Sequence, residues 1–338
     1  MKIFVTGGAG FIGSNFIRLL LTQHPEHQIV NFDKLTYAGN LENLADLAHL
    51  PNYRFIKGDI CQIEDVSQAI IGADAIVNFA AESHVDRSIK SAAPFVTTNV
   101  YGTQVLLDCA REAKIPRFIH ISTDEVGGSL EPNIYLTEDS RLFPASPYAA
   151  SKASAEHFVY AAQCTHKLDC IITRTCNNYG PYQFPEKLIP LIIANALEHK
   201  PLPVYGDGLN IRDWIYVVDN CKALYQVLIN GRAGEIYNIG ARTEKNNLEV
   251  IETILKLLDR PKDLIKFVAD RPGHDRRYGI DPSKIEKELH WQAEVNFEQG
   301  IQLTIDWYLN NQTWLERTRS GEYLKYYKEL YENRTETA

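Results

Sequence analysis

The sequence predicts an α/β protein: a doubly wound parallel sheet joined to a smaller domain of mixed α/β structure. Three observations lead to this prediction. A glycine-rich turn separates the first apolar strand from the first helix, strands and helices alternate regularly over residues 1–175, and the pattern becomes irregular after residue 180. At 338 residues the chain exceeds one typical domain. We expect a first domain over 1–180, revisited by about 211–240, and a second domain over 181–338.

Composition and charge narrow the classes of function. The formal net charge of −8 argues against a general nucleic-acid surface. The longest apolar run, residues 188–197, is too short to span a bilayer, and the N-terminus leads straight into a strand without a signal peptide. The six cysteines show neither a C-x-x-C pair nor metal-ligand spacing, so we expect reduced thiols and no metal site. These features together predict a cytoplasmic protein that binds neither nucleic acid nor membrane.

The glycine turn predicts a dinucleotide site. Residues 2–6 form a short apolar strand, Gly7, Gly10 and Gly13 follow, and residues 14–21 are amphipathic. In this context glycines allow close backbone approach, and the helix N-terminus offers amide groups to a pyrophosphate. Asp33 ends the second strand, 28–33, twenty residues after Gly13. A carboxylate there accepts from ribose hydroxyls and repels a 2′-phosphate, which favours NAD over NADP in a Rossmann-type domain. The alternative is a plain helix-capping Asp.

Two further strands bring polar groups to the same edge. Residues 55–60 are expected to form the third strand, with Asp59 at its tip where an adenine amino group could be read. Residues 75–81 form the fourth, and the small residues that follow suit a loop against the nicotinamide half of a cofactor. His84 lies in the next segment, where a structural histidine is the better interpretation than a catalytic one.

The next strand carries the candidate catalytic residues. The apolar run 117–121 continues into Thr123, Asp124 and Glu125, and ligands of open α/β sheets bind outside the carboxyl ends of strands. Tyr148 and Lys152 follow in a helical segment. Residues four apart share one helical face, so a phenol and an ammonium could act on one substrate atom.

The second domain carries a local basic pocket. We expect a helix over 187–199, an extended segment over 201–205, and strands over 211–216 and 235–239. Arg212 and the basic loop 271–277 suggest a site for a phosphate dianion, which arginine binds bidentately. The alternative is a solvated turn with surface ion pairs.

Eight segments carry a resemblance that covers nearly the whole chain. They are VTGGAGFIGSN, FDKLTYAGNL, FAAESHVDRSI, ISTDEV, SPYAASKASAEH, NNYGPYQFPEKLIP, YGDGLNIRDW and DRPGHDRRYGID. The chain resembles the dTDP-glucose 4,6-dehydratases, which are NAD-dependent lyases of the extended short-chain dehydrogenase/reductase family. The glycine motif and the Y-x-x-x-K pattern are common to the wider superfamily, whereas Thr-Asp-Glu and the Arg-Pro-Gly-His loop are narrower.

The resemblance implies a role for each group of residues. The catalytic residues would be Thr123, Asp124, Glu125, Tyr148 and Lys152. The NAD contacts would be Gly7, Gly10, Phe11, Ile12, Gly13, Asp33, Lys34, Leu35, Thr36, Asp59, Ile60, Ala80, Ala81, Thr98, Tyr148, Lys152 and Asn178. The contacts with dTDP-glucose would be Ser83, Thr123, Asn177, Lys187, Leu188, Pro203, Tyr205, Arg212, Asn247, Arg271 and His274, with the rest of loop 270–274. It also implies a homodimer through helices around 99–113 and 148–165, and a place in deoxysugar biosynthesis such as that of dTDP-rhamnose.

The implied reaction converts dTDP-glucose to dTDP-4-keto-6-deoxyglucose and water, with NAD kept bound and regenerated. Two alternatives share the glycine turn and the Tyr-Lys pair: a sugar-nucleotide 4-epimerase, and a non-catalytic NAD-binding regulator. The epimerase needs no acid pair after the Thr, and a regulator would be expected to lose Tyr148 or Lys152. The chain departs from the family pattern at Gly127, where Tyr is usual, and over residues 240–245.

Overall fold

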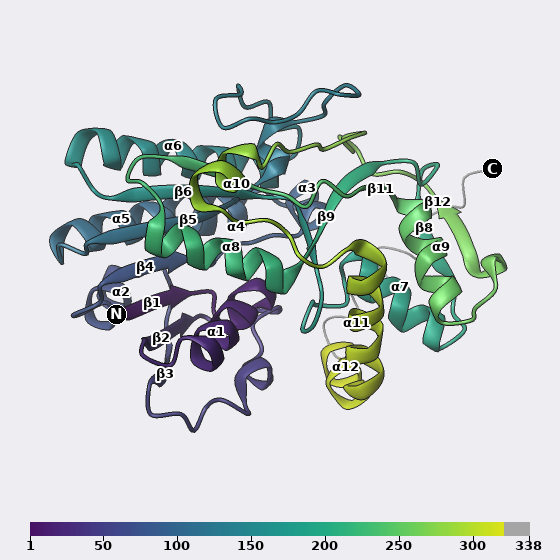
Figure 1. Ribbon diagram of the computed structural model, residues 1–338, viewed down its shortest axis with the longest axis horizontal. Helices are drawn as coiled ribbons and strands as arrows, with labels where there is room; N and C mark the ends of the chain where they lie inside the picture. The colour runs from purple at the N-terminus through teal and green to yellow at the C-terminus, as the bar shows by residue number, and fades with distance from the viewer. Residues whose placement is uncertain (321–338) are drawn as a thin grey trace.

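The computed structural model describes residues 1–320, so the end of the predicted second domain, 321–338, lies outside the described residues. A seven-stranded sheet fills one lobe, and a smaller lobe lies beside it (Figure 1). All neighbouring strands in the large sheet are parallel. Their order is β10 (Ile236–Ile239), β6 (Cys170–Thr175), β5 (Arg117–Thr123), β4 (Ala75–Asn78), β1 (Lys2–Thr6), β2 (Gln28–Asp33) and β3 (Tyr53–Lys57). The predicted doubly wound parallel sheet is confirmed.

The strand order explains where a ligand can enter. From β1 the chain runs outward to β2 and β3, then returns to β4 on the other side of β1 and continues to β5 and β6. The connections therefore diverge between β1 and β4, and a crevice forms at the carboxyl ends of these two strands.

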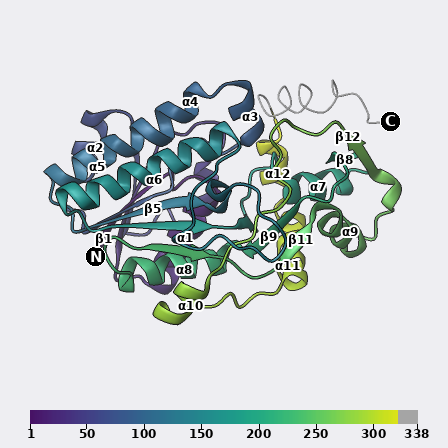
Figure 2. The ribbon, with the colours of Figure 1, turned by 90° about the horizontal axis from the view of Figure 1, so that it is seen from above.

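Helices cover both faces of the sheet, as Figure 2 shows. One face carries α2 (Ile63–Ala69), α3 (Val85–Lys90), α4 (Ala93–Phe95), the π-helical turn η2 (Val96–Tyr101), α5 (Gly102–Glu112) and α6 (Pro147–His166). The other carries α1 (Phe11–Gln23), α8 (Val217–Asn230) and α10 (Ser283–Leu289). Alternate side chains of one strand enter the two cores: Ile3 and Val5 pack on the side of α1, and Phe4 packs on the side of α5. Burial on both faces explains why these strands are continuously apolar.

The smaller lobe contains two short sheets and its own core. One sheet has the order β11 (Glu244–Asn246), β9 (Ile211–Tyr216) and β7 (Asn177–Tyr179), and the other pairs β12 (Ile265–Val268) with β8 (Leu202–Tyr205). Its helices are α7 (Leu188–Leu197), α9 (Asn247–Leu257), α11 (Phe297–Asn310) and α12 (Gln312–Thr318). The 3-10 turns within the part of the chain that the structure describes are η1 (Leu41–Leu44), η3 (Asp124–Gly127) and η4 (Lys262–Leu264). Between β9 and β11 the chain returns to the first lobe, where α8 covers the sheet and β10 extends it.

The two departures from the family pattern have local explanations. A Cβ at Gly127 would lie 2.6 Å from Cδ1 of Leu136, a buried side chain that packs directly against this glycine. In the segment 240–245, the amides of Ala241, Arg242 and Thr243 all donate to the buried carboxylate of Asp213. The side chain of Arg242 binds Glu286 at the surface of α10. The loop thus contacts the buried carboxylate of Asp213 through its backbone amides.

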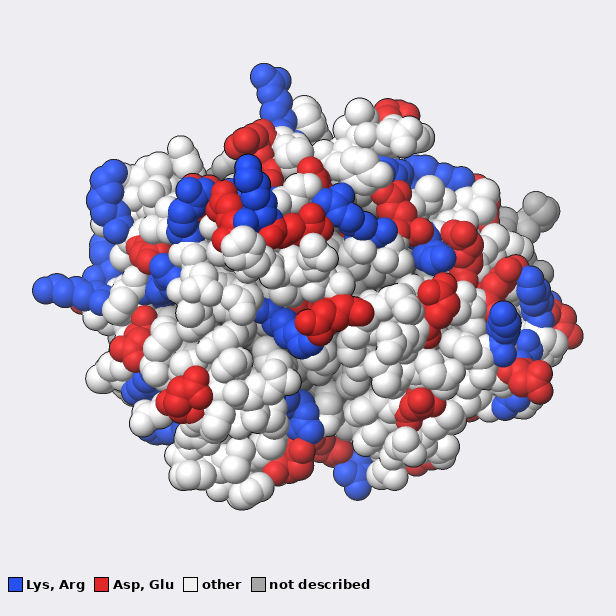
Figure 3. All heavy atoms as spheres, in the orientation of Figure 1, with Lys and Arg blue, Asp and Glu red and all other residues white. Residues whose placement is uncertain are grey.

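On the face shown in Figure 3, basic and acidic side chains are interspersed. Within residues 1–320, no helix has the length and apolar character needed to cross a membrane.

Candidate active site

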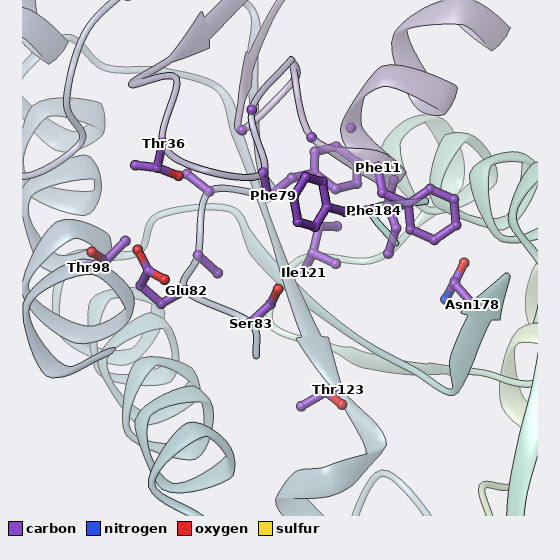
Figure 4. A pocket seen from close by; sticks show the side chains of 18 of the residues that line it. Phe11, Thr36, Phe79, Glu82, Ser83, Thr98, Ile121, Thr123, Asn178 and Phe184 are labelled. Atoms are coloured by element: carbon purple, nitrogen blue, oxygen red, sulfur yellow. The ribbon is translucent and has the colours of Figure 1, made fainter. Parts of the chain in front are cut away.

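A cavity of about 320 Å³ lies at the carboxyl ends of β1, β2, β4 and β5. All five candidate catalytic residues line it. So does each candidate NAD residue except Leu35, together with Ser83, Asn177 and Lys187 from the candidate substrate set. In the view of Figure 4, Thr36 and Thr98 lie at one side, Phe11, Phe184 and Asn178 at the other, and Ser83 and Thr123 between them. The chain therefore gathers its candidate cofactor and catalytic residues in one cavity.

The glycine turn is shaped for close backbone approach. Gly7 has φ +67, and a Cβ there would lie 2.6 Å from the backbone nitrogen of Ala80. A Cβ at Gly13 would lie 2.4 Å from the carbonyl oxygen of Gly7. Gly10 caps α1 without a side-chain hydrogen bond, and the first turn has no acidic residue. The first turn therefore places no acidic side chain of its own beside these amides, which suits a pyrophosphate site.

Asp33 and Asp59 occupy the adenosine side of the cavity. Asp33 accepts from the amide of Ala9 at 3.0 Å and from the amide of Leu35 at 2.8 Å, one bond to each carboxylate oxygen. Each oxygen retains capacity for another donor, so ribose hydroxyls fit there. Leu35 has φ 58 and supports Asp33 through its backbone without lining the cavity. Asp59 pairs with Lys34 at 2.7 Å. These residues fit the adenosine half of NAD.

The end of β5 presents Thr123, Asp124 and Glu125. The hydroxyl of Thr123 accepts from the amide of Glu125 at 3.3 Å and caps the turn η3. Asp124 is 3% exposed, and its Oδ2 has no hydrogen-bond partner within residues 1–320. Burial, and then the neighbouring charge of Glu125, raises the pKa of Asp124 well above its usual value. The two adjacent carboxyls thus lie in different environments: burial favours the protonated form of Asp124, whereas Glu125 is only partly buried.

Tyr148 and Lys152 reach the same cavity from α6. Ser146 caps the helix by accepting from Ala149 at 3.1 Å, and Pro147 begins it, which places Tyr148 in the first turn. Burial raises the pKa of Tyr148, and a hydrogen bond with Thr123 opposes this shift. Lys152 donates to the carbonyl of Ile121 at 2.5 Å. Burial lowers the pKa of Lys152 to about 8. In this structure the ammonium binds the strand beside the site, and the phenol binds Thr123.

The candidate substrate residues fall into two groups. Lys187 lines the main cavity and donates to the carbonyl of Ser83 at 2.8 Å, and burial lowers the pKa of Lys187. The second group does not line that cavity and consists of Leu188, Pro203, Tyr205, Arg212, Asn247, Arg271 and His274. Leu188 begins α7, Pro203 lies in β8, and Asn247 begins α9.

Part of this second group forms a cluster beside the cavity. The rings of Tyr205 and His274 lie 6.3 Å apart, edge to face. Arg271 lies 3.9 Å from the carboxylate of Asp86, a residue of α3 whose side chain is 8% exposed. His274 pairs with Asp270 at 2.6 Å, and burial lowers the pKa of His274 to about 4. The ion pair between Arg271 and Asp86 thus links the basic loop to the first lobe.

Two residues of the site received no role from the sequence. Asp86 lies in the quoted FAAESHVDRSI segment and Tyr278 in the quoted DRPGHDRRYGID segment, but neither segment indicates which of its residues lies beside the site. Tyr278 lies between Arg212 and Glu125, with its ring 4.1 Å from the guanidinium carbon. The sequence offers one chemical indication of such residues: a charged or phenolic group within a substrate-binding segment needs a partner when it is buried.

Comparison with known proteins places the chain among nucleotide-sugar enzymes. A family model described as GDP-mannose 4,6 dehydratase matches residues 4–304. A dTDP-glucose 4,6-dehydratase from Shigella flexneri is 50% identical over 361 residues, which cover 99% of this chain and 100% of that protein. DesIV, a dTDP-glucose 4,6-dehydratase from Streptomyces venezuelae solved with NAD bound, is 49% identical with a TM-score of 0.92, covering 94% of this chain and 100% of that chain.

An epimerase is similar in structure but more distant in sequence. The UDP-glucuronic acid 4-epimerase from Bacillus cereus, solved with UDP-glucuronic acid and NAD, is 30% identical with a TM-score of 0.87. It covers 92% of this chain and 99% of its own. Shared fold therefore does not separate the two activities, and the site residues must do so.

The fold and the site define the class: a Rossmann-type protein of the extended short-chain dehydrogenase/reductase kind. The chain belongs to the nucleotide-sugar dehydratase family that the matching model describes, in which its relatives at about half identity are dTDP-glucose 4,6-dehydratases. The resemblance predicted from the sequence is confirmed.

Proposed function

We propose that the chain is an NAD-dependent dTDP-glucose 4,6-dehydratase, which converts dTDP-glucose to dTDP-4-keto-6-deoxyglucose and water. One observation carries the proposal: Asp124 and Glu125 lie beside Thr123, Tyr148 and Lys152 in the same cavity as the glycine turn. Relatives at about 50% identity with this activity support it.

The residues around the cavity fit NAD. The glycine turn and the N-terminus of α1 would hold the pyrophosphate, Asp33 the ribose hydroxyls, and Lys152 the nicotinamide end of the site. When bound there, NAD supplies a hydride acceptor for C4 and a hydride donor for C6, so the reaction has no net redox change.

Oxidation at C4 prepares the elimination. The C5 proton of glucose is not acidic and hydroxide leaves poorly, but a ketone at C4 makes the C5 proton acidic. Tyr148 removes the 4-hydroxyl proton, and Thr123 holds the 4-oxygen through its hydroxyl. Because burial raises the pKa of Tyr148, this step needs positive charge nearby. Burial lowers the pKa of Lys152 to about 8, and its ammonium supplies this positive charge while it is protonated.

The two carboxyls have different roles in the elimination of water. Glu125 removes the C5 proton, and Asp124, protonated, gives its proton to the departing 6-hydroxyl. A proton then returns to C5 as hydride returns to C6, which gives the 4-keto-6-deoxy product. The raised pKa of Asp124 supports its role as the acid. A 4-epimerase has no C–O bond to break at C6 and needs no such pair, so Asp124 and Glu125 favour the dehydratase.

The nucleotide is recognised in the second lobe. Arg212 and Arg271 would bind the negatively charged pyrophosphate but cannot distinguish one base from another. Tyr205 offers a ring on which a pyrimidine can stack. Thymine and uracil differ by one methyl group, worth about 1–3 kcal/mol in a hydrophobic pocket. We expect a finite preference for dTDP-glucose over UDP-glucose and stronger rejection of GDP-mannose.

The proposal also covers the oligomeric state, the cellular location and the biosynthetic role of the protein. A homodimer through the helices around 99–113 and 148–165 is supported by four exposed large side chains in or beside them: Val96 at 56%, Tyr101 at 51%, Phe158 at 44% and Tyr160 at 59%. The cysteines are all free thiols, which supports a cytoplasmic location. The product class suggests a place in deoxysugar biosynthesis, of which dTDP-rhamnose formation is one example.

The test is a comparison of kcat/KM for dTDP-glucose, UDP-glucose, CDP-glucose and GDP-mannose, following the base-induced absorbance of the 4-keto product. The expected order places dTDP-glucose first and GDP-mannose far behind. Equal or faster turnover of UDP-glucose or GDP-mannose would contradict the assignment.

A further inference from the structure

Tyr278 joins the basic loop of the second lobe to the end of β5. Its amide donates to the carbonyl of Ile211 at 3.1 Å, which anchors the loop to β9. The residue is 3% exposed, and the guanidinium of Arg212 lies over its ring at 4.1 Å. Its phenol is thereby held at a fixed place beside the cavity.

The phenol of Tyr278 faces two carboxylates but has a single hydrogen to donate. Its oxygen lies 2.7 Å from Oδ2 of Asp275 and 3.5 Å from Oε2 of Glu125. The backbone carbonyl of Asp275 also accepts from Arg212 at 3.0 Å. Asp275 therefore holds both the phenol of Tyr278 and the guanidinium that covers its ring.

Glu125 has little else to orient it. It sits on the one-turn helix η3, and its amide binds Thr123. Within residues 1–320, the Tyr278 phenol is the only hydrogen-bonding partner found for the carboxylate of Glu125. A general base must lie within about 3.2 Å of the atom whose proton it removes, and such bonds often shorten when substrate binds.

We propose that Tyr278 is a positioning residue for Glu125, holding the carboxylate toward C5 of the substrate through its phenol. The inference rests on the proposed dehydratase function. At 3.5 Å from Oε2 of Glu125 and 2.7 Å from Oδ2 of Asp275, the phenol lies within reach of both carboxylates. Only the elimination step depends on this contact, since oxidation at C4 uses Tyr148.

The first experiment uses the full-length enzyme with its cofactor and the variant Tyr278→Phe, which keeps the ring under Arg212. The control is Tyr237→Phe, another buried tyrosine whose phenol donates to a carboxylate, that of Glu288 at 3.1 Å, on the side of the first lobe near α10. For Tyr278→Phe we expect kcat with dTDP-glucose to fall by about 10- to 100-fold, because small misplacements of catalytic groups cost that much. We expect KM to change less than about twofold and reduced nicotinamide to build up on the enzyme. The control should match the wild type in all three.

The second experiment combines Tyr278→Phe with Glu125→Gln. If the phenol acts through Glu125, the double variant is no slower than Glu125→Gln alone, and the two changes shift the melting temperature non-additively in the absence of substrate. A further loss of kcat in the double variant, or a Tyr278→Phe enzyme indistinguishable from the control, would overturn the inference while leaving the dehydratase assignment intact. A wild-type enzyme that forms no 4-keto product would overturn both.

Discussion

Replacing Asp124 by Asn should stabilise the protein while it impairs catalysis. Asn has nearly the same shape as a protonated carboxyl, and its amide oxygen can keep the bond from the Thr123 hydroxyl, which lies 3.3 Å from Oδ1 of Asp124. The substitution therefore removes one titratable proton from a buried site with little change in packing.

The sign and size of the stability effect follow from linkage. Burial raises the pKa of Asp124 in the folded protein above its unfolded value of about 3.9, so at intermediate pH the unfolded chain has lost this proton and the folded chain has kept it. Stability is then fully present below the unfolded pKa and falls as pH rises toward the folded pKa, by about 1.4 kcal/mol per pH unit. The asparagine side chain does not titrate, so the Asp124→Asn variant should gain stability over the wild type as pH rises above the unfolded pKa of about 3.9.

Two assays separate the effects. Denaturant unfolding at several pH values should show that the free energy of unfolding of the Asp124→Asn variant increasingly exceeds that of the wild type as pH rises. Steady-state kinetics should show a loss of kcat of about 10²–10⁴-fold, the usual contribution of a general acid, or about 3–5 kcal/mol. A variant that is less stable than the wild type, with no change in the pH slope, would mean that Asp124 is ionised in the fold and cannot be the acid.

The remaining predictions concern the cofactor and the order of steps. Because the proposed reaction regenerates NAD, purified protein should carry it and form product without added nicotinamide, and a stoichiometric rise of free NADH with product would refute this. Tyr148→Phe should slow every step, whereas Glu125→Gln should still allow oxidation at C4, so that bound NADH accumulates while elimination stalls. Rapid-mixing absorbance distinguishes these cases, and equal loss of C4 oxidation in both variants would show that the division of roles is wrong.

Local sequence patterns were enough to predict the parts of the site that lie on consecutive elements of the large sheet. The strand, glycine turn and helix at Gly7 to Gly13 are fixed by backbone sterics, and Asp33 follows at the end of the next strand. Parallel strands bring their carboxyl ends to one edge, so Asp33 and Thr123 line the same cavity although they lie on strands far apart in the chain. Periodicity and topology rules are sufficient for such contacts.

Individual side-chain contacts could not be predicted in this way. The helical spacing of Tyr148 and Lys152 correctly indicated one face, but not that Lys152 would bind the carbonyl of Ile121. Nor did any local pattern place Tyr278 beside Glu125, since these residues are 153 positions apart and meet only when the second lobe packs on the first. Pairings at such separations depend on tertiary packing, which a single sequence does not specify residue by residue.

The strand β9 shows how the second lobe acts on the acid of the first. Successive side chains of a strand point to opposite faces, so Arg212 turns toward Tyr278 and Asp213 turns toward the amides of residues 241–243. Among the causes that set the pKa of Asp124, the charge of Arg212 lowers it and that of Asp213 raises it. Burial raises the pKa of Asp213, and hydrogen bonds from the three amides oppose this shift by favouring the charged form. The loop that departs from the family pattern therefore reaches the catalytic acid through its backbone, and side-chain substitutions there should leave the acid unchanged as long as the three amides keep their positions.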